Sequence, residues 1–385
     1  MGRERRQEGA AMAMTATDRL SRDFRVRLYG TLSGNSSFAR VTAGMREGLE
    51  ACGKYGGTVS IEDLDDEERM GGGLVGMPEE TACAVYVGPP TGVGCMASWH
   101  QERWALLPAN SSWMPSNLLR IMWPHVTGFL APSRWAADVL RGYVGRIARD
   151  MGPRDVSVWP HGVGPEFVPY PDRYESRVAE YEDECFRVLH LASTRLERKG
   201  TAQLVEAWCM LLRDKRLPPR AELRLVLDEP PNWPEHVRRM AAEEPSIIHM
   251  DRAGATAHHA SAMYQACHVV CQPSRGEGFG LVPLEARASG VPVVMTGCTG
   301  HAEHAFDARG VAAVGVHLVA SHADAPIDDG PGAFAPEVRA EDVAETLGTV
   351  SKHWKILAEG AHEAAPFGKA WSWQDVTERW LKEER

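Results

Sequence analysis

Apolar residues follow two alternating patterns along the chain from residue 24 nearly to its end. Short runs rich in valine, leucine and isoleucine are typical of buried strands. Longer stretches with apolar residues three or four positions apart are typical of helices. Regular alternation of the two patterns indicates parallel sheets whose strands are joined by crossover helices. The sequence therefore predicts an α/β fold.

The first half of the chain predicts one sheet with its helices. A helix is expected from Ser36 or Ser37 to Gly53, because serine caps helix starts and glycine follows helix ends. A second helix is expected to begin at residue 134. The expected strands lie at 24–29, 57–61, 83–88, 94–99, 126–133 and 155–160.

The second half repeats the alternation more regularly. Residues 168–184 separate the halves with prolines, tyrosines and charges but no strand periodicity, and we interpret them as a linker. Residues 371–385 predict an amphipathic helix, with Trp373, Val376, Trp380 and Leu381 on its apolar side. The strands expected between these segments lie at 186–193, 223–228, 246–250, 268–274 and 291–295, and the helices at 201–215, 234–244, 258–267 and 340–354.

Length and composition favour a soluble protein of two domains. The 385 residues exceed what one hydrophobic core usually organises, and the shares of hydrophobic (44%) and charged (24%) residues are those of ordinary globular proteins. No apolar run approaches the roughly 20 residues of a membrane-spanning helix. We therefore expect a cytoplasmic protein, and contact of a surface patch with a membrane is compatible with this composition.

The net charge limits the class of ligand, and the cysteine pattern indicates the state of the thiols. A net charge of −10 without a cluster of cations argues against nucleic acid as a partner, whereas a small anionic ligand needs only a local positive pocket. The eight cysteines include no C-x-x-C pair, so we expect free thiols.

The stretch SRGEGFGLVPLEARASG, residues 274–290, predicts a phosphate-binding loop between a strand and a helix. Pro283 suits the first turn of this helix, and Gly290 suits the residue just past its end. Glycines in the loop let the backbone approach a ligand, and amides at a helix start bind phosphate. The amides expected to do so belong to Phe279, Gly280, Leu281 and Val282.

Two glutamates and two cations complete this candidate site. Carboxylates only accept hydrogen bonds, so Glu285 would hold the hydroxyls of a ribose and Glu277 those of a sugar. Arg195 and Lys199 follow another predicted strand, and they would neutralise the charge of a departing diphosphate. The plain alternatives are a helix-dipole role for Glu285 and an exposed charged loop around Lys199.

These residues resemble retaining glycosyltransferases of family 4. The resemblance rests on the E-x7-E pattern from Glu277 to Glu285, on the R-x3-K-G pattern ending at Gly200, and on the segment WSWQDVTERWL at 371–381. It extends more loosely to 130–141 and 159–169. It implies the GT-B architecture, in which two Rossmann-like domains face each other and a C-terminal helix crosses back to the N-terminal domain.

The resemblance also implies domain bounds and roles. Residues 1–22 would be a flexible N-terminus, 23–170 with 366–385 the acceptor-side domain, and 171–365 the donor domain. Arg195 and Lys199 would contact the donor diphosphate, Glu285 the ribose, and Glu277 with the Gly278–Gly280 backbone the transferred sugar. A hexosyl group would move from a nucleoside diphosphate sugar to a hydroxyl with retained anomeric configuration, without a metal or another cofactor.

Several further residues carry weaker signals. Gly34 in the first loop would either contact the sugar or the acceptor or form a plain turn. His100 and Glu102 would either contact the sugar or the acceptor or be solvated beside a packed tryptophan. Asp63-x-Asp65 offers a divalent metal site or a solvated acidic face, and Cys298, His301 and His304 offer a zinc site or a loop that lines the donor cleft.

Two other functions fit the same residues. One is a nucleotide-sugar epimerase or hydrolase on the same scaffold, and the other is a non-catalytic protein that binds a sugar nucleotide. The nucleotide base, the sugar, the acceptor and the oligomeric state are left open by the sequence.

Overall fold

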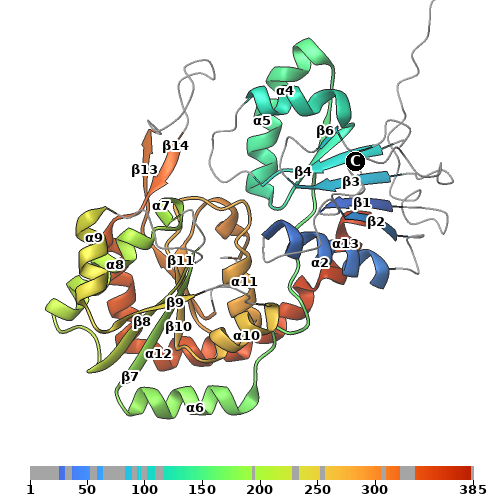
Figure 1. Ribbon diagram of the computed structural model, residues 1–385. Coiled ribbons are helices and arrows are strands. Elements are labelled where there is room, and N and C mark those ends of the chain that lie inside the picture. The colour runs from blue at the N-terminus through green and yellow to red at the C-terminus, as the bar shows by residue number, and fades with distance from the viewer. Residues whose placement is uncertain are drawn as a thin grey trace, which may run out of the picture.

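The chain forms two α/β domains side by side, each built on a parallel six-stranded sheet (Figure 1). This confirms the predicted fold class. The computed structural model describes residues 26–30, 37–52, 59–63, 83–88, 93–94, 96, 102–108, 116–192, 196–227, 234–251, 256–304, 309–320 and 334–382.

The N-terminal domain has the strand order β2-β1-β3-β4-β5-β6. Its core is closed on one side by α2, whose residues Val41, Met45 and Leu49 are buried as their spacing predicts. Its strands are β1 (Val26–Gly30), β2 (Val59–Asp63), β3 (Cys83–Val87), β4 (Glu102–Leu106), β5 (Gly128–Ala131) and β6 (Asp155–Val158). Its helices are α2 (Ser37–Ala51), α4 (Ser116–Met122), the 3₁₀ helix η2 (Trp123–His125) and α5 (Arg134–Met151).

One predicted strand of this domain is misplaced. Residues 93–94 form a helical turn and Met96 lies in a bend, so the strand expected at 94–99 is absent from the described residues there. The fourth strand is β4, in which Trp104 and Ala105 are completely buried. The error arose because the charges of Glu102 and Arg103 hide the buried run that follows them.

The C-terminal domain has the strand order β12-β11-β10-β7-β8-β9, which is the 3-2-1-4-5-6 order of Rossmann domains. Ligands of such sheets bind where the order reverses, between β7 and β10. Its strands are β7 (Cys185–Leu191), β8 (Arg220–Leu227), β9 (Ile247–Asp251), β10 (Val269–Gln272), β11 (Val293–Thr296) and β12 (Val311–Val314). Its helices are α6 (Pro171–Glu182), α7 (Leu196–Lys199), α8 (Thr201–Arg213), α9 (Glu235–Glu243), α10 (Ala257–Gln265), α11 (Leu281–Ala288), the 3₁₀ helix η3 (Thr299–His304) and α12 (Ala340–Ala364). A hairpin that the sequence did not predict pairs β13 (His317–Ala320) with β14 (Phe334–Glu337).

The segment interpreted as a linker is mostly the helix α6, and this corrects the prediction. Tyr174, Val178 and Tyr181 recur at helical spacing and pack against the core of the C-terminal domain. The buried Arg177 of α6 donates hydrogen bonds to Gln265 Oε1 and to the carbonyl oxygen of Gly290, each at 3.2 Å. The helix is therefore part of the C-terminal domain.

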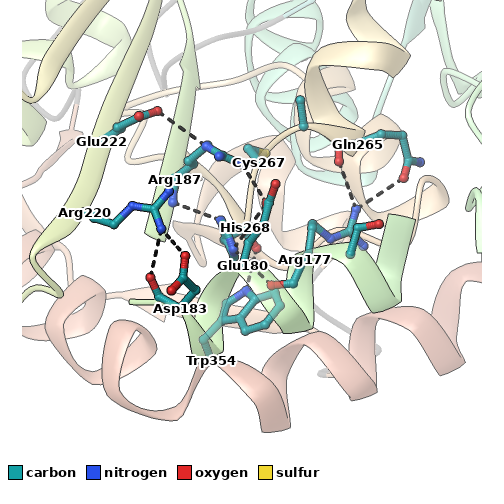
Figure 2. A network of polar contacts seen from close by, with 12 residues as sticks. Arg177, Glu180, Asp183, Arg187, Arg220, Glu222, Gln265, Cys267, His268 and Trp354 are labelled. Carbon is teal, nitrogen blue, oxygen red and sulfur yellow. Dashed lines mark hydrogen bonds and ion pairs between the residues drawn. The ribbon is translucent and has the colours of Figure 1, made fainter. Parts of the chain in front are cut away.

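A polar network joins α6 to the strands beside it, and its centre at His268 is buried (Figure 2). His268 Nδ1 accepts a hydrogen bond from the Arg187 amide at 3.0 Å, and Trp354 Nε1 of α12 donates to the His268 carbonyl oxygen at 2.7 Å. Burial lowers the pKa of His268 to about 3, so its ring is neutral at physiological pH. His268 Nε2 donates to the carbonyl oxygen of Arg177 on α6 at 3.2 Å, so the network joins α6 and α12 to the sheet.

The C-terminal helix returns to the N-terminal domain, as expected. After α12 the chain runs through η5 (Ala365–Trp371) into α13 (Trp373–Lys382), which packs on α2. Trp380 stacks on Trp159 with ring centroids 4.0 Å apart and planes 7° apart. A Cβ atom on Gly44 would lie 1.9 Å from Trp373 Cε2, so only glycine allows this close approach. Trp373, Val376, Trp380 and Leu381 are all buried.

A cavity of about 530 Å³ lies at the two chain segments that join the domains. Its walls come mainly from residues 163–169 and from the end of α12 and η5. Glu47 of α2 also lines it, and burial together with the nearby Glu166 raises the pKa of Glu47. None of its lining residues that the structure describes belongs to the loops that follow β7 and β10.

The structure also describes most of the cysteines and the apolar character of the helices. Every cysteine that it describes is a free thiol, most of them buried. In the described ranges, no helix has the length and apolar character to cross a membrane.

Candidate active site

The loop after β10 and the helix α11 have the predicted strand-loop-helix form. Gly280 precedes α11 with a φ of 98° and offers no side chain to cap the helix, and Gly290 follows it with a φ of 68°. A Cβ atom on Gly280 would lie 2.4 Å from Cδ2 of the buried His301. Backbone conformation and space both require glycine here.

The 3₁₀ helix η3 supports this loop from behind. The Gly300 amide donates to the carbonyl oxygen of Glu277 at 2.8 Å, and the Glu277 amide donates to Thr299 Oγ1 at 3.1 Å. A Cβ atom on Gly300 would lie 2.4 Å from the carbonyl carbon of Gly278. The loop backbone is therefore held in one position before any ligand contacts it.

Glu277 is a buried carboxylate held by two cations of α7. Lys199 Nζ lies 2.5 Å and Arg198 Nη1 lies 3.0 Å from the same oxygen, Oε1. Burial alone would raise the pKa of Glu277, but Lys199 and Arg198 hold it well below its usual range. Glu277 is thus ionised at physiological pH. Arg198 also donates to the Gly276 carbonyl oxygen at 2.6 Å.

The two loops at the switch point are in direct contact. Gly200 has a φ of 69°, and a Cβ atom there would lie 2.1 Å from the carbonyl oxygen of Pro273. The structure thus brings Lys199 and Glu277 together as the sequence predicts. Arg195, Gly34 and His100 lie outside the described residues.

Glu285 lies in the second turn of α11 and is only 2% exposed. Tyr264 of α10 donates a hydrogen bond to its Oε2 at 2.8 Å. Its Oε1 forms an ion pair with Arg40, which comes from α2 of the other domain. Sequence reasoning missed both partners, because each lies within an ordinary helical pattern far from Glu285 in the chain.

The start of α5 contacts the same loop from the N-terminal domain. Ser133 accepts a hydrogen bond from the Ala136 amide at 3.0 Å and donates one to the Gly278 carbonyl oxygen at 2.7 Å. The Arg134 amide donates to Glu303 Oε1 of η3 at 2.6 Å. The carboxyl-end loops of the two sheets therefore meet at the candidate site.

Glu102 is not brought to this site. It begins β4 and pairs in register with Cys83, at the amino ends of the strands, whereas the loops that meet follow the carboxyl ends. Its carboxylate accepts a hydrogen bond from Trp104 Nε1 at 3.0 Å and is buried.

In the part of the chain that the structure describes, no three histidine, cysteine or acidic side chains are grouped to hold a metal ion. His301 accepts or donates a hydrogen bond at 3.1 Å with Thr296 Oγ1, and burial lowers its pKa to about 4. Its neutral ring packs under Gly280. Of the other metal candidates, Asp65 and the side chains of Asp63 and His304 lie outside the described residues.

Comparison with known structures shows which fold these domains form. The Anabaena protein HepE, determined with UDP and glucose, superposes with a TM-score of 0.62 and 15% identity, over 92% of this chain and 98% of that one. WaaG, a glycosyltransferase of lipopolysaccharide biosynthesis, superposes with a TM-score of 0.60 and 12% identity, over 93% and 98%. The chain has the GT-B fold. At these identities the likeness concerns the fold alone.

Sequence comparison concerns mainly the C-terminal domain of this GT-B protein. Residues 186–349 match the family described as "Glycosyl transferases group 1". The D-inositol 3-phosphate glycosyltransferase of Pseudarthrobacter chlorophenolicus is 33% identical over 180 residues, which are 45% of this chain and 42% of that protein. The MMP alpha-(1->4)-mannosyltransferase of Mycolicibacterium hassiacum is 29% identical over 162 residues, 42% of this chain and 34% of that protein. Less than half of either relative is covered.

Proposed function

We propose that the protein is a retaining glycosyltransferase that moves a sugar from a nucleoside diphosphate donor to a hydroxyl of an acceptor, without a metal ion. The observation that carries the proposal is the ionised Glu277, held by Lys199 and Arg198 at the switch point of the C-terminal sheet. The family match over residues 186–349 supports the same assignment.

The donor diphosphate would bind at the start of α11. The amides of residues 279–282 lie at the positive end of the helix dipole, and Lys199 and Arg198 lie beside the loop. Arg195 would add a further cation, as the R-x3-K pattern implies. Glu285 would accept hydrogen bonds from the ribose, and Glu277 with the Gly278–Gly280 backbone would contact the sugar.

The reaction breaks the bond between the anomeric carbon and the diphosphate oxygen and forms a bond from that carbon to the acceptor oxygen. The cations stabilise the negative charge that develops on the leaving diphosphate. Attack from the face that the diphosphate leaves would retain the configuration, and a phosphate oxygen would take the acceptor proton. Contacts between the domains, such as Ser133 to Gly278, would exclude water from the cleft.

The acceptor would bind on the N-terminal domain. Gly34 and His100 remain our candidates for sugar or acceptor contact, whereas Glu102 is set aside because it lies at the amino end of β4. One matched relative is named for inositol 3-phosphate, and a polyol or sugar acceptor is therefore the first class to test.

The test is a panel of UDP-, GDP- and ADP-sugars incubated with and without polyol, sugar and lipid acceptors while nucleotide release is followed. Release that requires an acceptor, with a retained anomer in the product by NMR and an unchanged rate in EDTA, is expected. Epimerised sugar, release without an acceptor, or no turnover with any donor would contradict the proposal.

Variants sharpen this test. Glu277→Gln should lower the rate strongly, because the neutral amide changes both the sugar contact and the charge balance at Lys199. Glu206→Gln is the control, since Glu206 lies on α8, which directly follows α7, and pairs with His236 rather than with the loop. An equal loss of activity in both variants would remove the specific role of Glu277.

A further inference from the structure

An arginine of the N-terminal domain forms an ion pair with Glu285, the carboxylate that we propose binds the ribose. Arg40 lies on α2 and forms an ion pair with Glu285 Oε1, while Tyr264 donates to Oε2. Glu285 is 2% exposed and Tyr264 is completely buried, but the Arg40 side chain is 27% exposed. Both oxygens are engaged, and one partner belongs to the opposite domain.

A ribose that binds Glu285 must compete with one of these partners. Its hydroxyls donate to the carboxylate, and the buried surroundings of Glu285 leave little room for a third group at Oε1. Tyr264 is enclosed in the C-terminal core and cannot move aside easily. Arg40, whose side chain is partly exposed, is the partner that can move away.

The displaced guanidinium would stay close to the phosphates. Leu281 begins α11 and Glu285 lies four residues later, slightly more than one helical turn or about 6 Å along the axis. Lys199 and Arg198 both already pair with Glu277, so the diphosphate would gain from a charge that is not committed to that carboxylate. A guanidinium also matches phosphate geometry with paired hydrogen bonds.

We propose that Arg40 is a donor-binding residue that exchanges Glu285 for the donor diphosphate when the ribose binds. The proposal rests on the proposed function, in which Glu285 holds the ribose. In this arrangement the direct ion pair between Arg40 and Glu285 is broken when the nucleotide binds. The two domains are then connected through the nucleotide, whose phosphates contact Arg40 and whose ribose contacts Glu285. Donor affinity then depends on a residue of the acceptor-side domain.

The test compares a nucleoside diphosphate with its nucleoside. Whichever of UDP, GDP and ADP binds the full-length protein most tightly is titrated by calorimetry, and the matching nucleoside is titrated by ligand-observed NMR. Arg40→Gln should weaken the diphosphate about tenfold to a hundredfold, as for loss of a charged hydrogen bond, without weakening the nucleoside. Arg40→Lys should keep part of the lost affinity. Arg46→Gln, in the same helix but exposed and paired with Glu50, should change neither.

Two results would overturn the role of Arg40. Equal weakening of both ligands would mean that Arg40 only orients Glu285, and an unchanged diphosphate affinity would mean that it does not contact the phosphates. Thermal unfolding of Arg40→Gln and Arg40→Lys separates either result from a failure to fold. Glu285→Gln tests the ribose assignment separately: if it leaves nucleoside and diphosphate affinity unchanged, the proposed function of Glu285 fails whatever Arg40 does.

Discussion

Replacing Lys199 by methionine should destabilise the protein through Glu277. Removing one partner of a buried ion pair typically costs about 3–5 kcal/mol, because the remaining charge stays buried. Arg198 still lies 3.0 Å from the same oxygen and leaves the carboxylate partly compensated, so we expect a smaller loss of stability, about 2–3 kcal/mol. In the double variant Lys199→Met/Glu277→Gln the stranded charge is gone. The coupling energy of the pair should therefore be about 2 kcal/mol at pH 7.

The coupling should depend on pH in one direction. The folded pKa of Glu277 lies well below that of an unfolded glutamate, near 4.3, because Lys199 and Arg198 outweigh the opposing effect of burial. The stabilisation is complete above the unfolded pKa and is lost as the pH falls through the folded one. The coupling should thus be constant between about pH 5 and 7 and should decline in more acidic solution.

The assay is a double-mutant cycle of urea unfolding, with hydrogen exchange of peptides from α8 and β7 reporting on the C-terminal domain. Wild type, both single variants and the double variant are compared at each pH. A coupling below about 0.5 kcal/mol at pH 7, the limit within which independent sites add, would refute the buried pair. So would a coupling that grows as the pH is lowered.

Three further outcomes are expected. Trp380→Ala should lower the unfolding free energy of the N-terminal domain by about 3–5 kcal/mol. Hydrogen exchange should become faster in α2 and stay unchanged in β7; slower exchange in α2, or an equal acceleration in both elements, would contradict this. Gly300→Ala should lower the unfolding free energy by about 1–3 kcal/mol through overpacking and should weaken nucleoside diphosphate binding. Gly145→Ala is the control in thermal unfolding: its added Cβ would meet nothing within 4 Å, so it should not destabilise the protein. Ser133→Ala should cost about 1–2 kcal/mol through the lost cap of α5, and unchanged exchange in the first turn of α5 would exclude that role.

Local signals explain what the sequence predicted correctly. The glycines at 280 and 290 mark conformations with positive φ, so the loop and helix around Glu285 could be located from residue types alone. The tryptophans of α13 recur at helical spacing and are all buried. The helix α6 was wrongly predicted as a linker, because its prolines and charges are typical of linkers and its apolar face has only three residues.

The partners of the site residues could not be predicted in this way. Arg40 reaches Glu285 only because α2 and α11 face each other across the domains, and no spacing in the sequence reports that approach. Tyr264 looks like any buried helix residue until its hydroxyl is seen to reach the carboxylate. Arg198 differs from these two partners, because it directly precedes Lys199 in the chain and its role as a cation of the site could be predicted from that position.

The return of α13 has a consequence for the order of synthesis. Trp373, Val376, Trp380 and Leu381 belong to the core that also contains β1, α2 and Trp159. These four residues are translated after the whole C-terminal domain, so the N-terminal domain completes its core last although most of it is made first. A nascent chain would carry an open groove on α2 until then, and this groove is the surface that chaperones would need to cover.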